Sequence, residues 1–192
     1  MPQVEFETLI HSVRAGTHLA SFPTDTVPAL AAKPDRADLI FTAKQRSFDK
    51  PLILMASEVE ELWNYVKGSD WEIEIWSAIA QQYLPGALTL VLPANDRVPA
   101  AMNPSDPTTI GIRVPNHTIA RQILAQTGAL ATTSANRSGQ PALLSMAEIA
   151  AEFPEVLMLA SNSDEVASGT PSTVAKWTGE GWQILRQGAI GL

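Results

Sequence analysis

The sequence has no cysteine and only three histidines among its 192 residues. Without cysteine there are no disulfides, no thiolate nucleophile and no cysteine-based zinc site. His11, His18 and His117 are scattered along the chain and do not have the spacing of a metal-binding motif such as HExxH. We therefore expect no resident transition metal.

Long apolar runs are also missing. No stretch approaches the roughly 18 consecutive apolar residues that a membrane-spanning helix requires. The first seven residues carry Glu5 and Glu7, where a secretory signal would place lysine or arginine ahead of an apolar segment. These features predict a cytoplasmic protein that is neither exported nor embedded in a membrane.

Basic residues are fewer than acidic ones, 13 against 20, which gives a net charge of -7. This balance disfavours binding of nucleic acid along a broad basic face, although a local basic pocket remains compatible with it. The length suits one core, and neither a repeat nor a low-complexity linker divides the chain. We expect a single domain over residues 1–192.

Short β-branched or apolar runs alternate with segments of helical periodicity, a pattern that predicts an α/β fold. Serine followed three residues later by glutamate marks two helix starts, at Ser57–Glu60 and Ser145–Glu148, as capping boxes. We predict strands at 18–22, 53–55, 88–92, 110–114, 129–133, 156–160, 172–176 and 183–185. We predict further helices at 5–15, 35–45, 71–83 and 117–126. Pro/Gly-rich hinges between these elements favour a twisted, open sheet of mixed direction with flanking helices.

The usual phosphate-binding glycine motifs are absent, but three cations lie within seven residues: Lys44, Arg46 and Lys50. They follow a predicted helix and precede a strand, so they could clamp an anion such as phosphate. Cations at a helix C-terminus also complement the helix dipole while remaining solvated. From these residues alone, both interpretations stay open.

Two polar turns after predicted strands are further candidates. Residues 131–139 contain Ser134, Asn136 and Arg137, and residues 22–27 contain Asp25 and Thr26. Open α/β sheets bind ligands at the carboxyl ends of strands, where these turns are expected. The alternative is that Ser, Asn and Gly simply form turns.

Together and in this order, these segments resemble the YrdC/TsaC family of threonylcarbamoyl-AMP synthases. The matching segments are 23–30 (PTDTVPAL), 44–52 (KxRxxxKPL), 84–92 (LPGALTLVL), 109–115 (TxxxRxP), 133–139 (TSANRSG), 169–174 (GxxSTV) and 185–190 (LRxGAI). The resemblance covers residues 23–190, nearly the whole chain. Because the chain ends soon after the last segment, it is similar to the family's single-domain form.

The resemblance implies a YrdC-like fold, with its sheet around a large, concave, basic cavity. It also implies an enzyme that condenses L-threonine, bicarbonate and ATP into threonylcarbamoyl-AMP and pyrophosphate, with Mg²⁺ accompanying ATP. The reaction would be a nucleotidyl transfer, and a threonylcarbamoyl-transferase partner would then place the group on tRNA beside the anticodon.

The same resemblance implies roles for individual residues. Lys44 and Arg46 would be catalytic. The ATP-binding set would be Lys44, Arg46, Lys50, Ser134, Asn136 and Arg186. The threonine-binding set would be Thr26, Thr109, Arg113 and Ser172, with Arg113 on the substrate carboxylate, and Asp25 is a candidate for holding magnesium or water.

Charge counting is consistent with this allocation. If Lys44, Arg46, Lys50, Arg113, Arg137 and Arg186 line one cavity, the other 7 basic residues face 20 acidic ones. Such a surface suits a small anion in the cavity and predicts at most weak binding of tRNA.

Two positions depart from the family pattern. Pro28-Ala29 stands where relatives carry Tyr-Gly, which removes an aromatic wall and fixes the backbone of the threonine pocket. Pro171 replaces a glutamate, and Lys176 stands where an acid is common. Two other classes of function remain as alternatives: a non-catalytic module that binds RNA or the ribosome through the cavity, and a regulatory domain that senses nucleotide without turnover.

Overall fold

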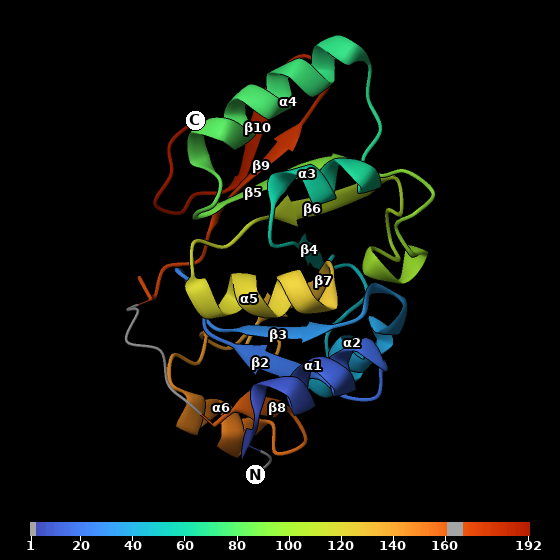
Figure 1. The fold of residues 1–192 in the computed structure, drawn as a ribbon. Helices are drawn as coiled ribbons and strands as arrows, with labels where there is room; N and C mark the ends of the chain where they lie inside the picture. Colours follow the sequence, from blue (N-terminus) through green and yellow to red (C-terminus); the bar gives the residue numbers. More distant parts are fainter. Residues whose placement is uncertain (1–2, 161–166) are drawn as a thin grey trace.

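The computed structural model describes residues 3–160 and 167–192. Their ten strands form one sheet in the order β1-β8-β2-β3-β7-β4-β6-β5-β9-β10 (Figure 1). The strands are β1 (Gln3–Val4), β2 (Ala20–Phe22), β3 (Ala29–Ala32), β4 (Ile53–Met55), β5 (Leu88–Pro93), β6 (Thr109–Arg113), β7 (Leu130–Ser134), β8 (Leu157–Leu159), β9 (Thr173–Trp177) and β10 (Trp182–Arg186). Parallel pairs such as β4–β6 and β5–β9 alternate with antiparallel ones such as β5–β6, so the predicted mixed α/β sheet is confirmed.

Helices connect and cover the strands. The α-helices are α1 (Phe6–Arg14), α2 (Asp38–Lys44), α3 (Val59–Leu62), α4 (Asp70–Tyr83), α5 (Thr118–Thr127) and α6 (Met146–Glu152). Short 3-10 turns lie at Pro34–Arg36, Trp63–Tyr65 and Ala100–Met102. Within residues 3–160 and 167–192, no helix is long and apolar enough to cross a bilayer.

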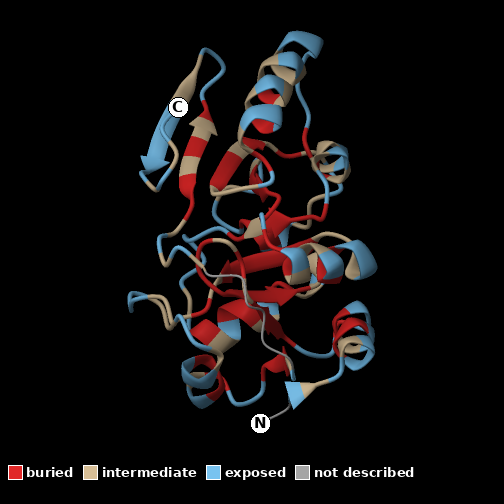
Figure 2. Cartoon of the chain, turned by 60° about the vertical axis from the view of Figure 1, so that its left-hand side comes forward, coloured by how far each residue is buried: buried red, intermediate tan, exposed pale blue. Residues whose placement is uncertain are grey.

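One face of the sheet is covered along its length by α2, α3, α4 and α6. Alternate residues of the central strands, among them Leu90, Ile112 and Ala175, point into this larger core and are fully buried there. In Figure 2 the strands are largely red, while the outer sides of the helices are pale blue. The hydrophobic alternation read from the sequence therefore places one side of each strand in this core.

The opposite face is covered over only part of its width. There α1 and α5 pack on β2, β3 and β7 in a second core that contains Leu9, Val13, Phe22 and Ile123. Over β4, β6, β5 and β9 this face lines a cavity instead. The side chains that alternate with the core residues, such as Thr89 and Arg113, are polar for that reason.

Two short strands escaped the sequence analysis. β3 has the sequence Ala-Leu-Ala-Ala, which has no β-branched residue to mark it as a strand, and β1 has only two residues. Tertiary pairing makes β3 a strand, because it lies between β2 and β7 and bonds to both. Pro28, which precedes β3, accepts the Ala135 N–H at its carbonyl oxygen at 2.9 Å.

The predicted capping boxes have different outcomes. Ser145 and Glu148 form one at the start of α6, where the Glu148 N–H donates to Ser145 Oγ at 3.2 Å. The box at Ser57 is wrong: α3 starts at Val59, and Ser57 Oγ donates to Glu61 instead. The analysis also missed a capping box of Ser69 and Glu72 at the start of α4.

Four tryptophans gather where α4 meets β9 and β10. Trp177 packs edge-on against Trp71, Trp76 and Trp182, with ring centroids 5.3 to 6.2 Å apart. Its indole N–H donates to Glu72 at 2.9 Å. The cluster lies on the core side of β9, so it fixes this end of the sheet without entering the cavity.

Candidate functional site

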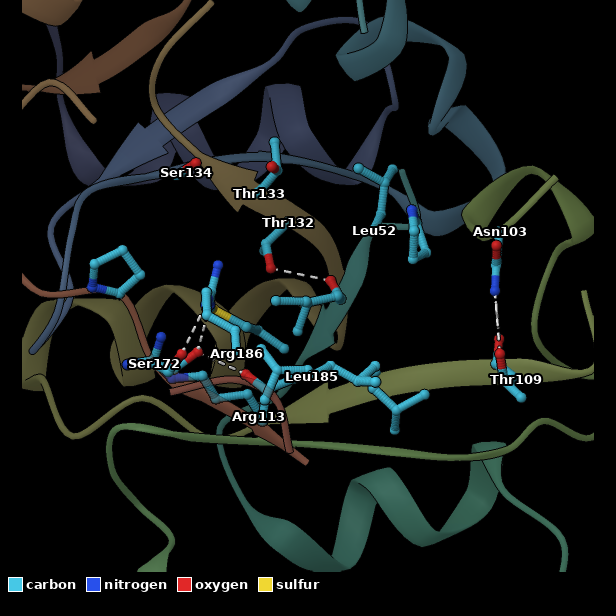
Figure 3. Close-up of a pocket in the computed structure, with 18 of the residues that line it drawn as sticks. Leu52, Asn103, Thr109, Arg113, Thr132, Thr133, Ser134, Ser172, Leu185 and Arg186 are labelled. Atoms are coloured by element: carbon cyan, nitrogen blue, oxygen red, sulfur yellow. Dashed lines mark hydrogen bonds between the residues drawn. The ribbon is translucent and has the colours of Figure 1, made fainter. Parts of the chain in front are cut away.

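A cavity of about 400 Å³ lies on the part of the sheet that α1 and α5 leave uncovered (Figure 3). Its volume falls within the usual range for small-molecule sites. The charged lining residues are Arg46, Asp49, Asp106, Arg113, Lys176 and Arg186. Within residues 3–160 and 167–192, four cations and two carboxylates thus surround a floor that is partly apolar, and these lining residues have a surplus of positive charge.

Arg113 at the end of β6 is the most constrained of these cations. Its guanidinium donates to Asp25 Oδ1 at 2.7 Å, Thr26 Oγ1 at 2.9 Å and the Gly86 carbonyl at 3.0 Å. Burial lowers the pKa of Arg113, and the neighbouring Asp25 carboxylate opposes that change. Asp25 also accepts the Asn116 N–H at 3.1 Å. Its carboxylate thus orients Arg113, which argues against its sequence-based assignment as a magnesium ligand.

Ser172 and Arg186 lie beside Arg113 at the same end of the cavity. Arg186 donates to the Ser172 carbonyl at 3.0 Å and to Ser172 Oγ at 3.2 Å, and the two hydroxyls of Ser172 and Thr89 are 2.8 Å apart. Arg186 is close enough to contribute to the lowered pKa of Arg113, after burial. Two neighbouring guanidinium groups, with Asp25 as the one carboxylate bonded to them among the described residues, form a good site for an anion.

Thr109 lies at the other end of β6, with Asn103 and Asp106. Asn103 Nδ2 donates to Thr109 Oγ1 at 3.2 Å, and Thr109 Oγ1 donates to Asp106 Oδ2 at 3.2 Å. Thr109 and Arg113 are four residues apart on one strand, which places their backbones about 13 Å apart. Figure 3 shows the Asn103–Thr109 pair well away from Arg113, Ser172 and Arg186. A single threonine is too short to contact both ends, so the predicted threonine-binding set is divided.

Arg46 enters the cavity from the loop after α2. Gln45 ends that helix with a left-handed backbone (φ 50°), which turns the chain toward β4. Arg46 donates from Nε to the Lys50 carbonyl and from Nη2 to the Pro51 carbonyl, both at 3.0 Å. Its pKa is lowered by burial, while Asp49 opposes the change. Arg46 therefore shapes its own loop while it lines the cavity.

Lys44 is buried beside the cavity. Its ammonium donates to the Ser134 carbonyl and to Asn136 Oδ1, the latter at 3.1 Å. Burial, followed by the charges of Arg46 and Lys50, lowers its pKa to about 7. The end of α2 is thereby joined to the turn after β7.

The structure brings most of the predicted residues to one cavity. Those that line it are Thr26, Arg46, Thr109, Arg113, Ser134, Ser172 and Arg186. Three others do not line it: the buried Lys44 donates to Asn136, and the exposed Lys50 donates from Nζ to Ser138 Oγ at 3.3 Å. Arg137 points away from it and pairs with Glu152. Only three of the six cations expected in the cavity are there.

The sequence analysis missed the cavity residues of one loop. Asn103, Ser105 and Asp106 belong to a Pro-rich segment that we interpreted as a hinge. Lys176 was noted only as a departure from a pattern. The alternation of side chains along β9 could have assigned Lys176 to the cavity. Ala175 and Trp177 point into the core, so Val174 and Lys176 point to the other side of the sheet.

Comparison with known proteins assigns the fold and its cavity to a family. The model of the Sua5, YciO and YrdC proteins, described as telomere recombination, matches residues 13–188. This chain belongs to the Sua5/YciO/YrdC family. The match contains both ends of the cavity, so the YrdC resemblance of the sequence is confirmed.

Two relatives in the Sua5/YciO/YrdC family are named threonylcarbamoyl-AMP synthase. A threonylcarbamoyl-AMP synthase of Pyrococcus abyssi is 33% identical over 178 residues, which are 91% of this chain and 51% of that protein. One of Vibrio parahaemolyticus is 30% identical over 189 residues, 95% of this chain and 98% of that protein. The chain therefore spans about half of the first relative and nearly all of the second.

Solved structures of the Sua5/YciO/YrdC family have the same architecture. P. abyssi Sua5 complexed with L-threonine matches with a TM-score of 0.84 and 31% identity, over 95% of this chain and 54% of that chain. E. coli YciO matches with a TM-score of 0.80 and 22% identity, over 98% and 93%. At that lower identity, YciO supports the fold alone.

Proposed function

We propose that this chain, as a single YrdC-like unit, is an L-threonylcarbamoyladenylate synthase, a nucleotidyltransferase that uses L-threonine, bicarbonate and ATP. The observation that carries the proposal is the relation to a synthase that this chain matches over nearly its whole length, at 30% identity. The cavity supports it with cations at two separate places, as expected for a reaction that joins two anions.

L-Threonine occupies the Arg113 end of the cavity. Arg186, which the sequence assigned to ATP, and the remaining N–H groups of Arg113 donate to its carboxylate, while Thr26 and Ser172 offer hydroxyls to its polar groups. The amine then takes up carbon dioxide or bicarbonate and becomes a carbamate. Because the cations already face this end, they screen the repulsion between the carbamate and the phosphates.

ATP binds with its phosphates toward Arg46 and Ser134 on the lining, while Lys44, Lys50 and Asn136 hold the loops behind them. Magnesium bound with ATP would neutralise charge on the phosphates during transfer. Asp49 and Asp106 are the carboxylates on the lining that fit such an ion, since magnesium prefers oxygen ligands. The carbamate oxygen attacks the α-phosphorus, and no side chain needs to form a covalent intermediate.

The product is a mixed anhydride that serves tRNA modification beside the anticodon. We propose that a threonylcarbamoyl-transferase partner accepts it, that the synthase contacts tRNA weakly, and that both steps take place in the cytoplasm. The acidic balance of the chain is consistent with a minor role for direct RNA contact.

The test is to incubate the purified protein with ATP, magnesium, bicarbonate and L-threonine and to search for threonylcarbamoyl-AMP by mass spectrometry. We expect the product and pyrophosphate in equal amounts, and we expect both to disappear in carbonate-depleted buffer. Pyrophosphate release at an equal rate without bicarbonate would exclude the carbamate as the attacking group. A protein that makes no adenylate but binds tRNA at nanomolar concentration would instead be the RNA-binding module.

A further inference from the structure

Paired residues on neighbouring strands form rows across the cavity floor, and two of these rows show how a ligand can lie in it. Val174 on β9 pairs with Thr89 on β5 and with Arg186 on β10. Arg113 on β6 belongs to the same row, because the neighbouring residues Ile112 and Leu90 pair with each other. Gly111 lies on the next row toward Thr109, two residues along β6 and roughly 6.6 Å away. A ligand that starts at Arg113 and extends along β6 therefore passes over Gly111 and reaches Thr109.

Lys176 is the cation of the Gly111 row. It pairs with Val91 on β5, and Val91 pairs with Gly111 on β6. Gly111 contributes no side chain to this row, and both Gly111 and Lys176 line the cavity. The Lys176 ammonium has no hydrogen-bond acceptor among the residues that the structure describes. Lys176 is thus an uncommitted cation next to the path of the ligand.

Asp106 is a carboxylate close enough to interact with the charge of Lys176, but its hydrogen bonds go to other residues. Asp106 accepts hydrogen bonds from the Thr108 N–H at 3.3 Å, the Thr108 hydroxyl and Thr109 Oγ1 at 3.2 Å. Thr108 contributes most to the lowered pKa of Asp106, and the charge of Lys176 contributes least. The ammonium is therefore on the Thr109 side of the cavity without a direct bond to Asp106. Among the described residues, Asp49 and Arg46 are further charged groups of the lining.

Phosphoryl chemistry supplies the link between these positions. In an in-line displacement, the attacking oxygen and the leaving oxygen lie on opposite sides of the phosphorus. The new bond joins the carbamate oxygen to the α-phosphorus, and the broken bond releases the bridging oxygen, with its electron pair, on pyrophosphate. With threonine at the Arg113 end, the pyrophosphate must leave toward Thr109. We propose that Lys176 binds the β- and γ-phosphates of ATP and holds the pyrophosphate as it leaves.

This inference rests on the proposed function for the direction of attack, but its test needs no turnover. Isothermal titration calorimetry would measure the binding of pyrophosphate, AMP and L-threonine separately to the wild type and to Lys176→Gln. We expect the Kd for pyrophosphate to rise about tenfold, the effect of losing one charge-assisted contact, with those for AMP and threonine unchanged. Lys176→Arg should recover most of the affinity. Lys67→Gln, which removes an exposed cation outside the cavity, is the matched control.

Unchanged pyrophosphate binding in Lys176→Gln would overturn the proposal, as would a loss confined to threonine. If the variant does not fold, inhibition of the wild type by pyrophosphate decides: competition with ATP and not with threonine supports the site, and competition with threonine overturns it. If pyrophosphate binding depends on Lys176 but the wild type forms no adenylate, the pyrophosphate site stands and the proposed function is wrong.

Discussion

Lys44 and Arg46 are both bonded to carbonyl oxygens of the protein before any ligand arrives. The sequence shows that these cations lie together, but it cannot show which way their side chains point. Lys44 turns inward to the 134–136 turn, whereas Arg46 faces the cavity. The two residues of one motif therefore differ in what their removal should do.

Arg46→Ala should lower kcat/KM for ATP by about 30- to 1000-fold, since a charge-assisted contact made mainly in the transition state is lost. Arg46→Lys should recover part of it, because an ammonium replaces the forked guanidinium incompletely. Steady-state rates beside thermal melts of both variants provide the measurement. If Arg46 only shapes its loop, the alanine variant melts earlier but turns over at nearly the wild-type rate.

Lys44 should make stability depend on pH. Its pKa falls from the ordinary 10.5 to about 7 in the folded protein, so between these values the unfolded chain binds more protons. Stability should therefore rise with pH above about 7, by at most about 1.4 kcal/mol per pH unit from this group. Urea unfolding of wild type and Lys44→Met from pH 6 to 9.5 tests it: the difference should shift in favour of the wild type as pH rises. A difference that stays constant would contradict the lowered pKa.

At the scale of elements, the strands with alternating apolar residues could be predicted from the sequence within a residue or two. β5, β6 and β9 are examples, because one face of each is buried and the other lines the cavity. β3 could not be predicted, because alanine has a low strand propensity and the partner strand β7 lies about 100 residues later in the chain. Capping boxes are local, but the motif at Ser57 forms none because Glu58 is the N-cap of α3.

Ser145→Ala should lower the free energy of unfolding by about 1 kcal/mol, because the Glu148 N–H loses its acceptor at the start of α6. Ser12→Ala, inside α1, serves as the control, and there alanine should be neutral or slightly stabilising. Denaturant unfolding of both variants is the measurement. Equal destabilisation at the two positions would show that the cap contributes nothing specific.

For the whole molecule, the charge is divided between cavity and surface. Among the residues that the structure describes, the lining takes four of 13 basic residues and two of 18 acidic ones, which leaves nine against 16 elsewhere. The sequence predicted a basic cavity in an otherwise acidic chain. It wrongly placed Lys44, Lys50 and Arg137 in that cavity, however, and it left Lys176 out. Residue spacing alone does not tell which side of a loop or strand faces the ligand.

From this division, tRNA should bind the isolated protein with a Kd of about 10^-4 to 10^-6 M at physiological salt, and more tightly as salt is lowered. ATP should compete, because both ligands need the cations of the cavity. Fluorescence anisotropy of labelled tRNA at several salt concentrations, with and without ATP, measures both effects. Tight binding that ATP leaves unchanged would contradict the expectation and place an RNA site outside the cavity.

The tryptophan cluster provides an intrinsic fluorescence signal. Trp177 follows Lys176 on β9 but points to the opposite side of the sheet, where three other indoles and Glu72 surround it. Indole emission is sensitive to such neighbours, so a shift of β9 on the cavity side becomes a change of intensity on the core side. Stopped-flow emission can therefore follow the arrival of substrates without a dye, and replacing Trp63, the tryptophan outside the cluster, would confine the signal to this end of the sheet.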